Sequence, residues 1–232
     1  NGNEIENGTI LKGTITSDVT LAAGNTYKLS GEYIVEEGAT LHIEEGVKII
    51  AVYDDIADYI LVKQGGKINA VGTSDKPIVM TSEKEEPGAW GGIHICGRAH
   101  TNAEGGKGSS EIGGAVYGGN DDADNSGTLQ YIRLEYTGFA FDEEHEANGI
   151  SFYGVGNGTI VDHCQAYKGS DDGFEFFGGS VNVSNLVAVS CSDDSFDWTE
   201  GWNGKGTNLV AYQEAESTLG YDCDCLMECD NN

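Results

Sequence analysis

Two short segments of the sequence carry paired carboxylates at equivalent positions. SDDGFEFF begins at residue 170 and SDDSFDWT at residue 192, so Asp171 and Asp172 recur 22 residues later as Asp193 and Asp194. Because Ca²⁺ prefers several oxygen ligands and binds carboxylates well, we expect these four side chains to form a calcium site. The alternative is that they make Asx-turns between strands and accept hydrogen bonds from local backbone N–H groups.

A second candidate calcium site lies at residues 122–127, which read DADNSG. This string matches the opening of an EF-hand loop, but the twelfth position is Arg133, where the loop needs a bidentate glutamate. An EF-hand is therefore excluded. A looser site that uses Asp122, Asp124 and Ser126 stays open, against the alternative of a plain solvated turn.

The overall composition restricts the function. The 232 residues include 39 Asp and Glu but only 12 Lys and Arg, a formal charge of −27. A surface this negative repels phosphate backbones and anionic membranes, so we expect no nucleic-acid partner. No apolar run approaches the length of a membrane-spanning helix, so we expect no transmembrane segment. The six cysteines are too few for a disulfide-dense small domain, and their pairing stays open.

Internal repeats indicate the fold that must position these side chains. Besides the 22-residue offset above, SNLVA at 184–188 returns as TNLVA at 207–211. Each repeat contains short runs with strand periodicity and Gly, Asn or Asp turns, and one such repeat cannot close a core alone. We therefore predict an all-β, right-handed parallel β-helix of about eight coils, each of roughly 22–24 residues. The coils should stack four pairs of inward side chains: Ile150 and Phe152, Phe174 and Phe176, Phe196 and Trp198, Met227 and Cys229.

The same stacking predicts an outward column of Glu175, Asp197 and Glu228. We expect one domain over residues 1–232, with residues 1–30 as a capping coil. The segments 98–126 and 139–149 break the period, so we expect them to be inserted loops. Insertions in repeat proteins often gather on the binding face, and we expect these two loops to be displayed toward a partner.

The run of motifs LVKQGGKINAVGTSDKPIVMTS, WGGIHICGRA, DDADNSGTLQYIRLEYTG and SDDGFEFFGG resembles the secreted right-handed parallel β-helix surface proteins, often lipoproteins, of Bacteroidota. The resemblance runs from about residue 14 to the end. It implies the same fold and a secreted or outer-surface location, with a lipid anchor in the precursor. It implies no catalytic residues. Members of this group continue through further coils after the segment that resembles LMECDNN, so we expect a truncated or processed form.

We therefore interpret the chain as a surface β-helix that acts as a binding or structural module for a glycan or a surface protein, stabilised by Ca²⁺. One alternative is a polysaccharide hydrolase that uses the surface carboxylates. GSDDG at 169–173 resembles the paired-aspartate element of polygalacturonase-like hydrolases, but their G-H-G and R-x-K elements are absent. A further alternative is a homo-oligomer formed by pairing of exposed coil edges.

Overall fold

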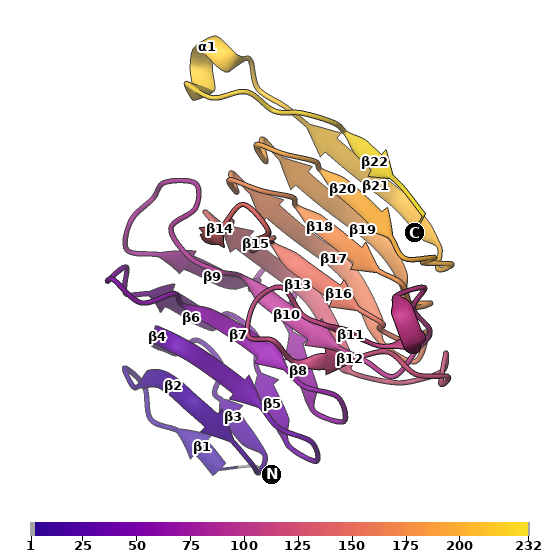
Figure 1. The fold of residues 1–232 in the computed structure, drawn as a ribbon. Coiled ribbons are helices and arrows are strands. Elements are labelled where there is room, and N and C mark those ends of the chain that lie inside the picture. Colours follow the sequence, from indigo (N-terminus) through magenta and orange to yellow (C-terminus); the bar gives the residue numbers. More distant parts are fainter. Residues whose placement is uncertain (1–2, 232) are drawn as a thin grey trace.

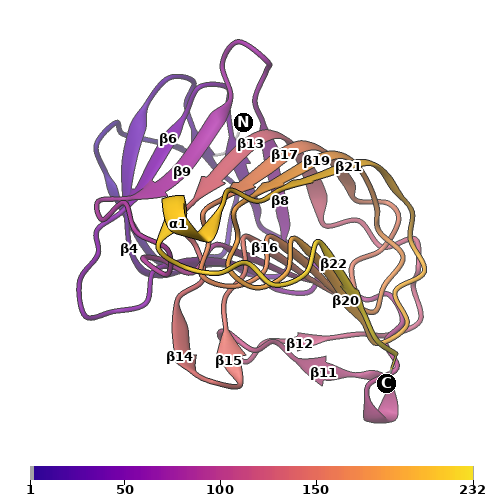
Figure 2. The same cartoon turned by 90° about the horizontal axis from the view of Figure 1, so that it is seen from above.

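The computed structural model describes residues 3–231, which wind into a right-handed parallel β-helix (Figure 1). Seen along its axis, the solenoid has three sheet faces (Figure 2). Every strand pair within the solenoid is parallel, so side chains at equivalent positions of successive coils lie above one another. The predicted fold class is confirmed.

Face 1 is built from one short strand segment per coil, and eight such segments pair in succession. Its strands are residues 13–15 of β2 (Ile10–Ile15), residues 32–35 of β4 (Thr26–Val35), β7 (Tyr59–Val62), β10 (Ile93–Cys96), β16 (Ile150–Tyr153), β18 (Phe174–Phe177), β20 (Phe196–Thr199) and β22 (Met227–Cys229). The number of coils agrees with the sequence-based expectation.

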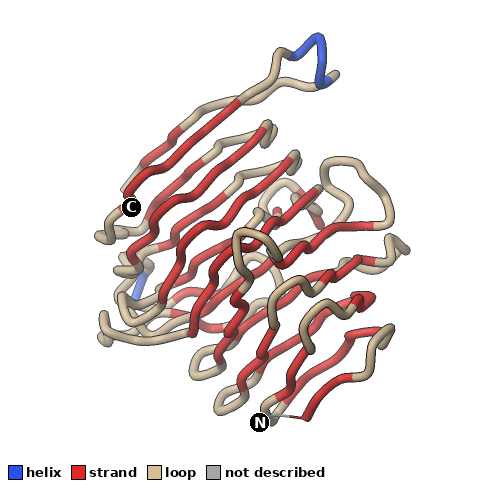
Figure 3. Tube along the Cα trace, turned by 180° about the vertical axis from the view of Figure 1, so that it is seen from behind, coloured by secondary structure: helices blue, strands red, loops and turns tan. Residues whose placement is uncertain are grey.

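Faces 2 and 3 share long strands that bend in the middle. Face 2 contains β1 (Asn3–Ile5), β3 (Val19–Leu21), β5 (Thr40–Ile43), β8 (Lys67–Val71) and the first halves of β13 (Gly127–Glu135), β17 (Ile160–Tyr167), β19 (Asn182–Val189) and β21 (Gly206–Tyr212). Face 3 contains the first halves of β2 and β4, then β6 (Lys48–Ala51), β9 (Ile78–Ser82) and the second halves of the four long strands. Figure 3 shows these parallel strands from behind.

The bend between faces 2 and 3 is made by a residue in the left-handed region of each long strand. Tyr131, His163, Asn185 and Asn208 have φ of 51°, 52°, 54° and 53°. Asparagine tolerates this conformation, and its side chain also links coils, since Asn208 Nδ2 donates to Asn185 Oδ1 at 3.1 Å. The rings of Tyr131 and His163 stack with centroids 4.5 Å apart. Contacts between coils thus help to hold each bend.

The interior follows the predicted ladder. Phe152 stacks on Phe176 with centroids 4.9 Å apart, and Phe174 stacks on Phe196 at 5.6 Å. The register of β22 places Met227 beside Phe196 and Cys229 beside Trp198, as predicted. Met227 and Cys229 are exposed in the last coil that the structure describes, whereas burial of the phenylalanine rings supplies the main stabilisation of the stacked coils.

The two segments that break the period form small antiparallel hairpins outside the solenoid (Figure 2). Segment 98–126 contains η1 (Glu104–Gly106), β11 (Gly108–Ser109) and β12 (Val116–Tyr117), and segment 139–149 contains β14 (Ala140–Asp142) and β15 (His145–Glu146). Both pack against the outside of face 1 and form a second apolar cluster with it. Its members include Leu61, Cys96, Tyr153 and Phe177 from face 1 and Ile112, Ala115, Tyr117 and Ala147 from the hairpins.

Regular helix is scarce in the part of the chain that the structure describes. The one α-helix there, α1 (Glu216–Leu219), has four residues and lies in the connection between β21 and β22. No helix among residues 3–231 is long and apolar enough to cross a membrane.

Candidate cation site of stacked carboxylates

The four aspartates Asp171, Asp172, Asp193 and Asp194 lie in two turns that enter face 1. Asp171 and Asp172 precede β18, and Asp193 and Asp194 precede β20. The backbone N–H of Gly173 donates to the carbonyl of Asp194 at 2.9 Å, which holds the two turns in register. The 22-residue offset in sequence thus becomes a spacing of one coil.

Three side chains form a ladder of hydrogen bonds along the axis. Asn148 Oδ1 accepts the N–H of Asp172 at 3.2 Å, Asp172 Oδ1 accepts that of Asp194 at 3.0 Å, and Asp194 Oδ1 accepts that of Cys225 at 3.0 Å. Each of these hydrogen bonds therefore connects one coil to the next, whereas the hydrogen bond of an Asx-turn joins residues of the same coil. Asp172 and Asp194 support the backbone in this way and still have a second carboxylate oxygen available.

Carboxylate oxygens of these aspartates converge in two groups. One oxygen each from Asp171, Asp172 and Asp193 lie within 4.8 Å of one another, and the same holds for Asp172, Asp194 and Asp197. Asp172 belongs to both groups, so the two groups are contiguous. Asp171, Asp172 and Asp194 are buried and Asp193 is partly accessible, which leaves the cluster open on one side.

Burial and mutual repulsion raise the pKa of three of the four aspartates, Asp171, Asp172 and Asp194. Burial, followed by the charge of Asp172, raises the pKa of Asp171 far above the usual carboxyl range. Burial also raises the pKa of Asp172 to about 8 and that of Asp194 into the neutral range. No Lys or Arg of residues 3–231 forms an ion pair with any of the four aspartates. Without a cation, such carboxyls hold protons at neutral pH, and a divalent cation is the natural replacement for those protons.

The predicted outward column continues this acidic surface. Glu175, Asp197 and Glu228 occupy equivalent positions of β18, β20 and β22. The pKa of Glu175 is raised by burial, by the charges of Asp172 and Asp197, and by its hydrogen bond to Asp197. Asn148 Nδ2 donates to Glu175 Oε2 at 2.6 Å. The column and the four aspartates therefore form one continuous carboxylate cluster.

Two contributors were not assigned to this site from the sequence. Asp197 was placed in the column, but its oxygen also joins the group of Asp172 and Asp194. Asn148 was placed at the end of an inserted loop, yet it begins the hydrogen-bond ladder. The signal for Asn148 is the alignment of NGISFY at 148–153 with DGFEFF at 172–177.

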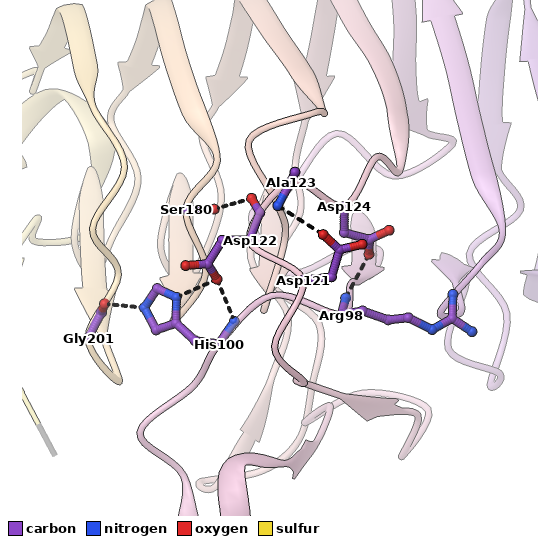
Figure 4. Close-up of polar contacts among 8 residues, drawn as sticks. All are labelled: Arg98, His100, Asp121, Asp122, Ala123, Asp124, Ser180 and Gly201. Atoms are coloured by element: carbon purple, nitrogen blue, oxygen red, sulfur yellow. Dashed lines mark hydrogen bonds and ion pairs between the residues drawn. The ribbon is translucent and has the colours of Figure 1, made fainter.

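The second predicted site has different surroundings. Asp122 Oδ1 accepts the backbone N–H of His100 at 3.0 Å and faces its ring nitrogen Nδ1 at 2.8 Å (Figure 4). Asp124 Oδ2 accepts the N–H of Arg98 at 2.7 Å. Ser126 is buried, and its N–H donates to Thr159. Neither Asp122 nor Asp124 belongs to a convergent carboxylate group of residues 3–231.

These contacts give the DADNSG segment a structural role. His100 Nε2 lies 2.8 Å from the carbonyl oxygen of Gly201, so His100 links Asp122 to the turn after β20. Ser180 Oγ also donates to the carbonyl of Asp122 at 2.6 Å. Figure 4 shows these polar contacts bracing segment 98–126 against neighbouring coils.

The fold and the stacked carboxylates define an acidic parallel β-helix. A family model described as a pectate-lyase like beta helix domain matches residues 13–232, and the chain belongs to that family. No curated protein and no solved structure matches the chain.

Proposed function

We propose that the protein is a carbohydrate-binding β-helix, stabilised by Ca²⁺ and located outside the cell, either secreted or held at the surface by a lipid anchor on its precursor. Membership of a pectate-lyase like β-helix family supports a carbohydrate ligand. A surface protein is the alternative ligand. The observation that carries the calcium part is the convergence of Asp171, Asp172 and Asp193 in one group and of Asp172, Asp194 and Asp197 in the adjoining group.

The environment of the cluster favours calcium over smaller cations. The oxygens come from five carboxylates, of which Asp193 and Asp197 are partly accessible, and Ca²⁺ accepts many oxygen ligands in irregular geometry, whereas Mg²⁺ demands a near-ideal octahedron and gives up its water reluctantly. Partial exposure of Asp193 leaves room for water ligands. A cation here would replace the protons that Asp171 and Asp172 otherwise hold, and would tie together the turns of two coils.

Equilibrium dialysis at millimolar free Ca²⁺ tests the site directly. The parent protein should bind the ion, and the variant Asp172→Asn should lose most of that binding, because Asp172 contributes to both groups. Asp122→Asn is the matched control for the second predicted site. Absence of bound calcium in the parent protein would rule out the calcium part of the proposal.

A polysaccharide hydrolase is the second candidate function, because Glu175 and Asp197 form a partly buried carboxyl pair on the outer side of face 1. The pair is hydrogen-bonded directly. Glycosidases keep their two carboxyl groups about 5 Å or more apart, so that a sugar and a nucleophile fit between them. The direct contact therefore favours binding over hydrolysis. A screen of polysaccharides for new reducing ends separates the two functions.

Self-association is a further candidate because the last coil has an accessible edge. Among the described residues, β21 pairs only with β19 and β22 only with β20. Val210, Tyr212 and Met227 on these strands are each more than half exposed. An unpaired strand edge can add another strand. Sedimentation at two protein concentrations tests this candidate, and a strict monomer contradicts it.

A further inference from the structure

The outer side of face 2 differs from the rest of this acidic molecule. One column of outward side chains runs along it at equivalent positions of six coils. Its members are Thr20, His42, Asn69, Thr128, Ile160 and Asn182. None of these six is Asp, Glu, Lys or Arg, although the whole chain carries a formal charge of −27 and the next position of the column, opposite Thr20 in β1, is Glu4. All six are at least partly exposed.

A second column lies beside the first and has similar chemistry. It contains Val71, Gln130, Asp162, Ser184 and Thr207. Its one carboxylate, Asp162, accepts hydrogen bonds from Ser184 Oγ at 2.9 Å and from Asn185 Nδ2 at 2.8 Å. His163 Nδ1 lies 2.9 Å from the same carboxylate. The two columns together, which we call the neutral face, therefore present mainly hydroxyl, amide and small apolar groups.

The neutral face is hollowed at both ends. A groove of about 670 Å³ near the N-terminal coils is lined by Thr20, His42 and Asn69, and also by Glu44 and Glu45 from the turn after β5. A second groove of about 440 Å³ near the C-terminal coils is lined by Ile160, Asn182 and Thr207, together with one carboxylate, Asp162, and one ammonium group, Lys205. Both grooves thus lie along the same two columns, in the direction of the solenoid axis.

These features define the chemistry of a ligand. Parallel stacking repeats the hydrogen-bonding groups of the neutral face at the strand spacing of ~4.8 Å, so a ligand with its own regular repeat can use them coil after coil. The net negative charge disfavours polyanions. A polycation would prefer the carboxylates of face 1, where the charge is concentrated. A linear, uncharged, hydroxyl-rich polymer suits the neutral face best.

We propose that the neutral face binds a linear neutral polysaccharide, with the chain laid along the solenoid axis between the two grooves. This inference rests on the proposed carbohydrate-binding function and assigns it to a surface and a class of glycan. It differs from the expectation that the inserted loops form the binding face. Much of the apolar surface of those loops is used for packing, since Ile112, Ala115 and Tyr117 are buried against face 1.

Affinity electrophoresis tests the assignment. The gels contain hydroxyethylcellulose, xylan, galactomannan or polygalacturonate. The double variant H42E/I160E places one carboxylate in each groove, at side chains that make no hydrogen bonds of their own. The matched control V116E/F141E adds the same charge at exposed positions of the two hairpins.

We expect at least one neutral polysaccharide to retard the parent protein. H42E/I160E should weaken that binding by about tenfold or more, because the new carboxylates must lose water without gaining a partner when the chain binds. V116E/F141E should bind like the parent. If H42E/I160E melts far below the parent, N69A/T207A replaces it, since it removes an amide and a hydroxyl without adding charge and should also weaken binding.

The possible contrary outcomes show whether the neutral-face assignment fails alone or fails together with the proposed carbohydrate-binding function. Loss of binding in V116E/F141E alone, or equally in both double variants, overturns the neutral face and leaves a carbohydrate-binding protein. If polygalacturonate is the only polysaccharide that retards the parent protein, the neutral face is likewise overturned and a carbohydrate-binding protein is left. If no polysaccharide retards the parent, the proposed carbohydrate-binding function fails, and the neutral-face assignment fails with it.

Discussion

The Oδ1 atom of Asp172 accepts the backbone N–H of Asp194 at 3.0 Å, and these two residues are equivalent positions of successive coils. One side chain therefore holds the next turn in place and also contributes a carboxylate oxygen to both convergent groups. The bond requires only an acceptor, which a neutral amide also supplies. The charge of Asp172 is thus separable from its structural role by mutation.

The variants Asp172→Asn and Asp172→Ala should separate these two roles. Asp172→Asn keeps an acceptor for the Asp194 N–H and removes a carboxyl that resists ionisation, so we expect it to match or exceed the parent in calcium-free stability at pH 8. Asp172→Ala leaves that N–H without its partner and should cost about 1–3 kcal/mol. Urea denaturation in a chelator measures both values. Equal destabilisation by the two variants would contradict the ladder.

The calcium-free protein should become less stable as pH rises. The pKa of Asp172 is raised by burial to about 8 in the folded state, while the unfolded group titrates near its ordinary value. Above that ordinary value the unfolded state releases the proton and the folded state keeps it, so the free energy of unfolding falls as pH rises toward about 8. Melting temperatures between pH 4 and pH 9 in a chelator measure this fall.

Calcium should oppose the loss of stability at high pH. The ion binds the ionised carboxylates, so its stabilising effect should be small near pH 5 and large near pH 8. The same pH series with millimolar Ca²⁺ provides the comparison, and Asp172→Asn provides a variant in which the effect should shrink. A calcium-induced shift in melting temperature that is the same at both pH values would contradict binding at these aspartates.

Phe176 should be among the most sensitive positions of the core. It stacks on Phe152 in the preceding coil, and the ring of Trp202 lies 4.5 Å away on centroids. Phe176→Ala removes both contacts and leaves a cavity, so we expect a loss of about 3–5 kcal/mol. Phe141→Ala is the control, because Phe141 is 57% exposed, and it should change stability by less than about 1 kcal/mol. Similar losses for the two variants would contradict a stacked aromatic core.

The repeated segments predict the core well because stacking turns sequence offsets into contacts. The offset between Phe174 and Phe196 is enough to place them side by side, since parallel register fixes which residues meet. Asn148 shows the limit of this reasoning. Its residue type differs from the aspartate of the next coil, and an insertion precedes it, so the repeat is harder to recognise there.

The inserted segments are less predictable because their sequences lack a period. Nothing in their composition shows that Tyr117 packs on Tyr153, with ring centroids 5.1 Å apart. That contact depends on how an irregular hairpin fits a particular sheet. Likewise, the sequence DADNSG is compatible both with a metal-binding loop and with a segment that makes structural hydrogen bonds. Only the structure shows that Asp122 contacts the His100 ring and that Asp124 accepts the Arg98 N–H.

Segment 98–126 should loosen when its contact with the turn after β20 is removed. Tyr117 Oη donates to the Glu200 carboxylate, 3.0 Å from each oxygen, and Thr101 Oγ1 donates to the same group at 2.5 Å. Tyr117→Phe keeps the ring in the apolar cluster but loses a hydrogen bond to a charged acceptor, which contributes about 1.5–3 kcal/mol. Hydrogen exchange should therefore accelerate within residues 98–126 and stay unchanged in β16 and β18. Tyr212→Phe, at an exposed tyrosine on β21, should leave exchange in that segment at the parent rate. If Tyr117→Phe exchanged no faster than Tyr212→Phe, the hydrogen bond from Tyr117 to Glu200 would not help to hold the segment.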